Sequence, residues 1–234
     1  MFAGLIPLPY WSLLPIIAYT TRLGPPNARC VDANQSEITN LLQQFIASFP
    51  YASNFTDTYE KGTEPLSGSY QLSGTLCVPK TGERNVSHIQ FLVHGVGVDS
   101  RYWDYTADDD EYSYVSASAD AGIATFRYDR LGTGLSEKPK DAYNVVQAAT
   151  DTAITVKFAQ MLRDGSIGIK GQKYNKILGV GHSYGSIVMQ AVTSNAPTAL
   201  DGDMLTGFSA NAQDCNSGHA HITGIRDRIS SFPP

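Results

Sequence analysis

Residues 181–185, Gly-His-Ser-Tyr-Gly, constrain the fold of this chain more than any other stretch. The β-branched and apolar run 176–180 precedes them, and a helix-like segment follows. This pattern predicts a serine at a sharp turn from a strand into a helix, with Gly181 and Gly185 small enough to let the two elements pass closely. Such a turn holds the hydroxyl of Ser183 out at the end of a sheet, where it can act as a nucleophile.

Strand-like and helix-like segments alternate along much of the chain. We expect strands at residues 67–78 (one long or two short antiparallel strands), 88–93, 123–128, 176–181 and 203–208, and helices at 112–121, 144–163 and 186–195. Strands that alternate with helices indicate βαβ units. The sequence therefore predicts an α/β fold, with a mostly parallel sheet flanked by helices.

Acyl transfer by a serine requires donors for the oxyanion besides a base and an orienting carboxylate. One predicted donor is the backbone N–H of Tyr184, because the amino-terminal end of a helix favours developing negative charge. The other is the backbone N–H of Val96, in the turn that leaves the strand at residues 88–93. In the same turn, His94 and Gly95 support the site, and the glycine lets the backbone approach a substrate.

Three stretches together resemble the α/β-hydrolase superfamily: His94-Gly95, residues 128–136 (Tyr-Asp-Arg-Leu-Gly-Thr-Gly-Leu-Ser) and residues 181–185. The chain looks most like secreted, fungal-type members with an "AB hydrolase-1" domain, over residues 67–209. The resemblance implies hydrolysis of a small-molecule ester, or less often an amide, through an acyl-serine on Ser183. It implies no cofactor and no metal, and a supporting rather than catalytic role for residues 128–136.

Other interpretations of these glycines fit less well. Gly179, Gly181 and Gly185 resemble a dinucleotide fingerprint stretched by one residue, but no acidic residue ends a next strand at the expected distance of about 20 residues. A phosphate-binding loop requires Gly-Lys-Ser or Gly-Lys-Thr, which this sequence lacks. Serine at position 183 disfavours the family branches that use an aspartate nucleophile.

The acid and base of a catalytic triad are harder to place. In the family they follow the nucleophile in the chain, and Asp214 with His219 or His221 satisfies that order. We favour the interpretation that these are ordinary loop residues and that the fold is incomplete after its sixth strand. The chain then resembles the first two-thirds of a hydrolase and is expected to be poorly stable and nearly inactive. The alternative function is a non-catalytic hydrolase-like fragment that binds a small ligand or partner.

The amino-terminal third predicts a different organisation. Residues 1–19 carry no charged side chain and resemble a signal peptide or signal-anchor, although three prolines also fit a buried or mis-started segment. Residues 20–66 form an expected arm, with a polar linker at 56–65. The hydrolase domain is expected over residues 67–234, and no stable membrane span is expected once a signal is removed.

Sequons and cysteines indicate the secretory pathway. Glycosylation sequons begin at Asn34, Asn54 and Asn85. In that compartment Cys30 and Cys77 are a candidate disulfide, which leaves Cys215 as the odd thiol. We therefore expect a secreted glycoprotein.

Charge and composition exclude other functions. A formal net charge of −5 disfavours nucleic-acid binding, and the cysteine spacing disfavours a zinc site. The acidic run 108–111 lacks the spacing of a calcium loop and is expected at the start of the next helix. Tyr102 and Trp103 fit either a substrate pocket or packing of their loop.

Overall fold

The computed structural model describes the chain at residues 4–7, 11–23, 60–79, 87–106 and 110–209. By contacts the chain divides into two units. The first comprises residues 1–16, 68–138 and 151–208, and the second comprises residues 17–67, 139–150 and 209–234. The first unit contains the sheet and the candidate site.

A six-stranded sheet forms the centre of the first unit, in the order β1-β4-β7-β5-β8-β9. Its strands are β1 (Gly4–Pro7), β4 (Gly74–Val78), β5 (His88–Val93), β7 (Ala124–Tyr128), β8 (Lys176–His182) and β9 (Gly202–Thr206). β4 pairs antiparallel with β1 and β7, whereas β7, β5, β8 and β9 run parallel. The predicted α/β class with a mostly parallel sheet is therefore confirmed.

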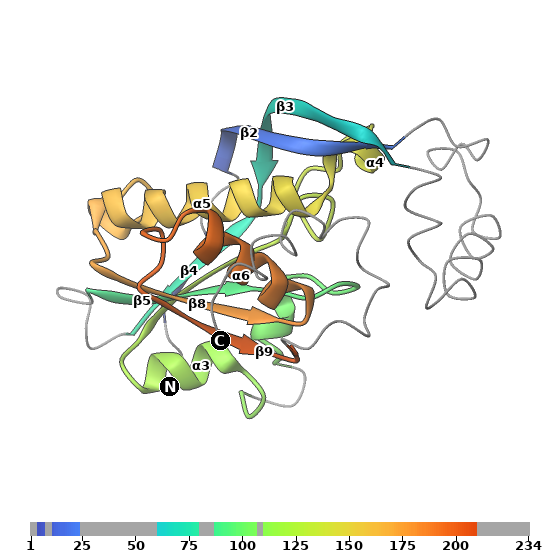
Figure 1. Ribbon diagram of the computed structural model, residues 1–234. Coiled ribbons are helices and arrows are strands. Elements are labelled where there is room, and N and C mark those ends of the chain that lie inside the picture. The colour runs from blue at the N-terminus through green and yellow to red at the C-terminus, as the bar shows by residue number, and fades with distance from the viewer. Residues whose placement is uncertain (1–3, 8–10, 24–59, 80–86, 107–109, 210–234) are drawn as a thin grey trace, which may run out of the picture. The chain divides into compact units, whose positions relative to one another are not determined.

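Helices α5 (Ala148–Asp164) and α6 (Tyr184–Asn195) cover one face of this sheet (Figure 1). The ring of Phe158, on α5, lies 4.8–6.3 Å from the rings of Phe91, Phe126 and Tyr128 on β5 and β7. All four side chains are fully buried. Aromatic burial of this extent stabilises the contact by ~2 kcal/mol or more for each ring.

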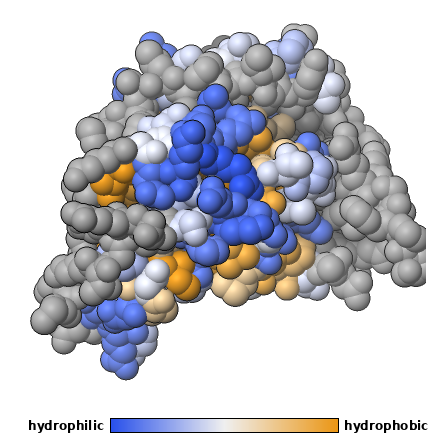
Figure 2. All heavy atoms as spheres, turned by 90° about the vertical axis from the view of Figure 1, so that its left-hand side faces the viewer, coloured by the Kyte–Doolittle hydropathy of each residue, from blue (hydrophilic) through white to orange (hydrophobic). Residues whose placement is uncertain are grey.

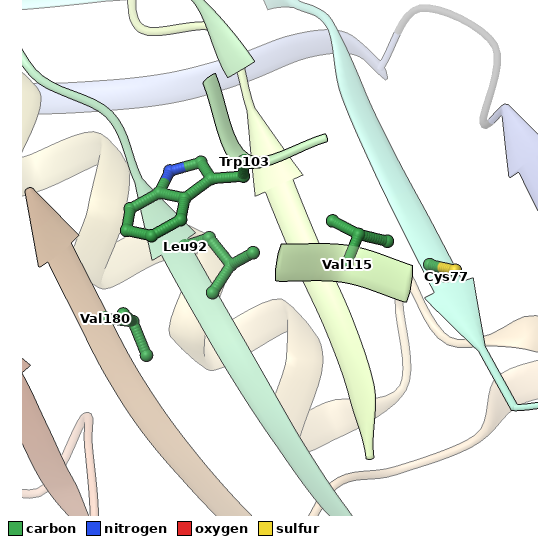
Figure 3. Close-up of a cluster of buried hydrophobic side chains, with 5 residues drawn as sticks. All are labelled: Cys77, Leu92, Trp103, Val115 and Val180. Atoms are coloured by element: carbon green, nitrogen blue, oxygen red, sulfur yellow. The ribbon is translucent and has the colours of Figure 1, made fainter. Parts of the chain in front are cut away.

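The opposite face of the sheet is covered by α3 (Tyr114–Asp120) and the 3-10 helix η1 (Ser100–Trp103). Figure 3 shows the core there: Trp103 lies over Leu92, with Val180 beside them and Val115 and Cys77 further along the sheet. Leu92 and Phe91 are neighbours in β5, so their alternation places one side chain in each core. Both faces of the central strands are thus buried, as their nearly continuous apolar sequences require.

Several predicted boundaries differ from the observed ones. The helix predicted at 144–163 is two helices, α4 (Ala142–Val145) in the second unit and α5, because a turn at residues 146–147 separates them. The helix predicted at 112–121 begins only at Tyr114, because Ser113 caps it: its side chain accepts a hydrogen bond from the Ser116 N–H at 3.0 Å. Asp110 and Glu111 therefore precede the helix and do not form its first turn.

The polar linker predicted at residues 56–65 is wrong from residue 60 onward. Strand β3 (Glu60–Leu72) begins there and pairs with β2 (Trp11–Leu23) in a two-stranded sheet. Pairing with a second strand overrides the low strand propensity of this polar sequence. The strand predicted at 67–78 is divided by Ser73 between β3 and β4, which lie in different sheets.

Charged groups gather at the amino-terminal ends of the parallel strands. Just before β9, Asp201 accepts hydrogen bonds from the Ile177 N–H, Arg163 and Lys176 at 2.7–3.1 Å. These bonds, the backbone one first, lower the pKa of Asp201 to about 2. Figure 2 shows the side of the molecule toward which these strand ends point, and hydrophilic side chains dominate the centre of the described surface there.

Candidate active site

Ser183 occupies the predicted turn between β8 and α6. Its φ of 53° and ψ of −118° are unusual for a residue with a side chain, and it has the one positive φ among the described residues other than glycine. Its N–H donates to the carbonyl of Thr206 at 2.8 Å, and its carbonyl accepts from the Ser186 N–H at 2.9 Å. The side chain is exposed and makes no capping hydrogen bond, so the strained backbone presents a free hydroxyl.

Close contacts explain why glycines flank this serine. A Cβ on Gly185 would lie 2.1 Å from the carbonyl oxygen of Val93, at the end of β5. A Cβ on Gly181 would lie 2.5 Å from the backbone nitrogen of Ser186. Helix α6 therefore starts directly against the ends of β5 and β8, which fixes where Ser183 points.

This contact gives a first prediction, for Gly185→Ala. The added methyl group meets backbone rather than a movable side chain, so we expect a loss of ~3 kcal/mol or more in the free energy of unfolding. The matched control is Gly202→Ala in β9, where the nearest atom to an added Cβ is a Leu178 methyl at 3.5 Å. Urea denaturation measures both variants, and equal midpoints for the two would contradict this account of the turn.

The turn after β5 lies against Ser183. A Cβ on Gly95 would lie 3.2 Å from the Cβ of Ser183, so the backbone of residues 94–97 passes beside the serine. Val96 is 72% exposed. In the part of the chain that the structure describes, neither the Val96 N–H nor the Tyr184 N–H donates a hydrogen bond. Both predicted oxyanion donors are therefore free to bind an acceptor.

His94 is buried below this turn and holds its shape. Its Nδ1 donates to the carbonyl of Gly95 at 2.9 Å, and its Nε2 accepts from the Arg130 N–H at 3.1 Å. Because Gly95 offers an acceptor and Arg130 a donor, these bonds define a neutral imidazole, and burial lowers its pKa. His94 has no nitrogen left for a general base and serves to position the loop.

The side chain of Arg130 connects the loop at residues 94–97 with Tyr184. Its Nη1 donates to the carboxylate of Asp151 at 2.7 Å, and its Nη2 donates to the carbonyl of Gly95 at 3.2 Å. The guanidinium also lies over the ring of Tyr184, 4.5 Å from the ring centroid, and the Tyr184 hydroxyl donates to Asp151 at 3.2 Å. One buried cation thus contacts both the loop that carries Val96 and the residue that follows Ser183.

Burial is the main influence on the pKa values within this network. It raises the pKa of Asp151, against the opposing effect of Arg130, and it raises the pKa of Tyr184 well above its ordinary value. Within the described residues, Oδ1 of Asp151 and Nε of Arg130 are buried without a hydrogen-bond partner. The hydrogen bonds of this ion pair therefore do not fully offset the free-energy cost of desolvating its two charges.

His182 precedes Ser183, and its side chain is held by residues of other segments. Its ring stacks on Tyr102, with centroids 4.6 Å apart, and its Nδ1 lies 3.1 Å from the hydroxyl of Thr206. That hydroxyl donates to the carbonyl of Gly181 at 2.9 Å, so the imidazole nitrogen is the donor to it. His182 joins the end of β9 to the loop after β5.

An open cavity of about 1200 Å³ adjoins the turn after β5. Gly97 forms one edge of it, and Tyr102, Tyr105 and Tyr112 contribute aromatic rings to its wall. Trp103, in contrast, is 5% exposed and belongs to the core. Trp103 therefore packs in the core, as one of the two interpretations predicted, whereas Tyr102 lines the cavity.

Other predicted site residues lie outside the described part of the chain. They are the candidate acid and bases Asp214, His219 and His221, the sequons at Asn34, Asn54 and Asn85, and Cys30 of the candidate disulfide. Cys77 is buried in β4. His88 begins β5, at the strand end opposite the turn that lies beside Ser183.

Sequence reasoning missed the roles of Arg130 and Asp151. Arg130 lies in the motif 128–136, but the pattern there did not indicate its partners. Asp151 lies 21 residues from Arg130 and 33 from Tyr184, in a helix whose sequence marks no site. The only signal was a charged residue on the face of the predicted helix that carries Ile154 and Phe158.

The described residues form no helix that has both the length and the apolar composition of a membrane span. Nor do they contain a group of three or more His, Cys, Asp or Glu side chains that could hold a metal ion.

Comparisons with known proteins give one family. A family model described as "Alpha/beta hydrolase family" matches residues 90–232. A search of curated proteins found no match.

Many solved structures are similar to this chain at low identity. One is a thermostable carboxyl esterase from Bacillus coagulans, with 18% identity, a TM-score of 0.45, and coverage of 69% of this chain and 46% of that one. Epoxide Hydrolase A from Mycobacterium thermoresistibile has 21% identity and a TM-score of 0.43, with 57% and 35% covered. The alpha/beta hydrolase GrgF from Penicillium sp. sh18 has 15% identity and a TM-score of 0.44, with 58% and 41% covered. The chain thus spans between about a third and a half of the length of these solved proteins.

Proposed function

The chain belongs to the alpha/beta hydrolase family, and we propose that it is a serine hydrolase that cleaves carboxylic esters through an acyl-enzyme on Ser183. One observation carries the proposal. An exposed serine hydroxyl in a strained turn lies beside a loop, and the free N–H groups of Val96 and Tyr184 belong to these two segments. This combination supplies both a nucleophile and donors for an oxyanion.

The proposed reaction has two steps, acylation of Ser183 and hydrolysis of the acyl-serine. The Oγ of Ser183 forms a bond to the ester carbonyl carbon while its proton passes to a base, and the carbonyl oxygen gains negative charge. The Val96 and Tyr184 N–H groups bind that oxygen, and the positive end of the α6 dipole favours its charge. The bond to the alcohol oxygen then breaks, and the alcohol leaves with the proton. Water repeats the sequence on the acyl-serine and releases the acid.

The base comes from outside the described residues. His94 has both ring nitrogens engaged, and His182 is held by Tyr102 and Thr206. His219 and His221, with Asp214 as the acid, are one source in this chain, and a histidine of a longer natural product is the other. Replacement of His219 and His221 by Ala distinguishes these two sources. The variant loses activity only if the base is one of these two histidines.

A fluorophosphonate probe tests the proposal directly. Only a serine with an activated hydroxyl and an oxyanion site reacts with it at a useful rate. We expect one adduct per chain by intact mass, located on the peptide that contains Ser183. The assay uses the 234-residue chain and the longest natural product that contains it. Absence of labelling in both favours the alternative of a hydrolase-like protein that binds a ligand without reaction.

We also propose that the protein is a secreted glycoprotein of the fungal type that its motifs resemble. The uncharged amino-terminal segment 1–19 and the three sequons support this location. Treatment of the protein from its native source with peptide N-glycosidase is expected to lower its apparent mass. Triple replacement of Asn34, Asn54 and Asn85 by Gln is expected to remove the effect. If peptide N-glycosidase leaves the apparent mass of the wild-type protein unchanged, secretion as a glycoprotein is contradicted.

A further inference from the structure

Two residues that line the cavity beside the turn after β5 connect it to the surroundings of Ser183. Gly97, on its edge, is the second residue after Gly95, whose backbone lies against Ser183. Tyr102, on its wall, stacks on His182, the residue before the nucleophile. A group bound in this cavity would therefore extend from a carbonyl held at Ser183.

The wall of the cavity is rich in aromatic surface. Tyr102, Tyr105 and Tyr112 are 41%, 51% and 63% exposed, so each offers accessible surface to a ligand in the cavity. Three flat rings around one space bind another flat ring well, because aromatic contacts add ~0.5–1.5 kcal/mol beyond the burial of area. The shape and chemistry of this wall favour an aromatic group.

Every charged side chain that lines the cavity has an opposite charge beside it. Asp99 pairs with Arg101 at 2.7 Å, and Asp104 pairs with Arg127 at 2.6 Å. The second pair is largely buried, with side chains 10% exposed. The lining therefore has no unpaired charge to recognise an anion or a cation, and desolvation disfavours a charged ligand.

The part of the wall around Tyr102 and Asp104 is held in place before any ligand arrives. Asp104 accepts from Ser113 at 2.7 Å as well as from Arg127, and Arg127 donates to the carbonyl of Ser100 at 3.1 Å. Trp103, which is buried, meets Tyr102 edge-to-face with centroids 5.1 Å apart. Little conformational entropy is lost when a ligand binds a wall already held in place.

We propose that this cavity binds an uncharged aromatic group of the substrate, so that the preferred substrates are aromatic esters without a formal charge. The inference rests on the proposed function for its chemistry, because it takes Ser183 as the nucleophile. The binding of the ring itself depends only on the tyrosines and the paired charges of the wall.

Binding to the Ser183→Ala protein tests this inference without turnover. Methyl 4-fluorobenzoate is titrated and followed by ¹⁹F NMR, and methyl cyclohexanecarboxylate competes for the same site. We expect the aromatic ester to bind about 5-fold more tightly than the saturated one. The 4-fluorobenzoate anion and 4-fluorobenzylammonium are both expected to bind more weakly than the neutral ester.

Variants of the wall connect this binding to the cavity. Tyr105→Ala and Tyr112→Ala are expected to weaken it several-fold, whereas Tyr105→Phe and Tyr112→Phe retain it, because the ring rather than the hydroxyl makes the contact. The control Leu178→Ala removes an exposed apolar side chain that does not line the cavity and is expected to leave binding unchanged.

Each outcome bears on one proposal. No preference for the aromatic ester, tighter binding of either charged probe, or equal binding by the Tyr→Ala variants would overturn the inference. Aromatic preference in Ser183→Ala together with no fluorophosphonate labelling of the wild type would support the binding of the ring in the cavity and reject the proposed reaction. Fluorophosphonate labelling of the wild type without a preference for the aromatic ester would support the proposed reaction and reject the aromatic binding site.

Discussion

Replacing Ser183 with Ala is expected to abolish fluorophosphonate labelling and to lower ester turnover by about 10⁴-fold or more, because no other atom of the site can form the acyl intermediate. The side chain of Ser183 makes no capping hydrogen bond, so its loss leaves no buried group without a partner. The free energy of unfolding should therefore remain within ~0.5 kcal/mol of the wild-type value, or rise slightly as strain changes. Labelling by intact mass and urea denaturation measure the two quantities.

Ser194→Ala is the matched control for this experiment. Ser194 lies near the other end of the same helix, α6, and is partly exposed. It should retain labelling and turnover. Labelling that persists in Ser183→Ala at the wild-type rate would show that another residue reacts, and the proposed function would then be wrong.

Removing one member of the Arg130–Asp151 pair is expected to have the second large effect. Both side chains are less than 10% exposed, so Asp151→Asn leaves the Arg130 guanidinium buried without its counter-charge. Loss of one partner from a buried pair costs ~3–5 kcal/mol in the free energy of unfolding. Labelling should also slow by about 10–100-fold, because the guanidinium no longer holds Gly95 and Tyr184 in one arrangement.

A double variant separates stability from positioning. Arg130→Met with Asp151→Leu replaces the pair by apolar side chains, which often restores or exceeds the original stability. We expect the free energy of unfolding to recover while the slow labelling persists, because the hydrogen bond to the Gly95 carbonyl and the contact with the Tyr184 ring are both lost. With an ester substrate the loss should appear in kcat and not in KM, since oxyanion donors act on the transition state.

The opposite result has a clear meaning. If labelling recovers together with stability in the double variant, the pair only stabilises the fold. The contacts of Arg130 with Gly95 and Tyr184 then have no effect on the reaction. Arg130→Lys gives an independent comparison, because an ammonium keeps the charge but cannot reach Asp151 and Gly95 with the fork geometry of a guanidinium. If the pair positions Gly95 and Tyr184, fluorophosphonate labelling of the Arg130→Lys variant should be slower than labelling of the wild type.

The local structure around Ser183 could be predicted from sequence because it depends on neighbours in the chain. A β-branched run, two glycines at fixed spacing and a following apolar helix allow few backbone arrangements. The same locality explains why the strands predicted at residues 88–93 and 176–181 agree with the observed β5 and β8 to within one residue. It also explains the errors at the ends of helices, where caps and turns compete over one or two residues. The first part of β3, residues 60–66, was missed because its pairing with β2, rather than its own sequence, makes it a strand.

By itself, then, the sequence determined the α/β class and the turn that presents the Ser183 hydroxyl. Only the tertiary structure decided that Arg130, Asp151 and Tyr184 form one buried network and that three tyrosines share one cavity. The physical reason is the register of the parallel strands: β5, β7 and β8 end at the same edge of the sheet, so loops far apart in the chain meet there. Which side chains then touch depends on packing across 20 to 40 residues of intervening chain, and no short-range pattern encodes it.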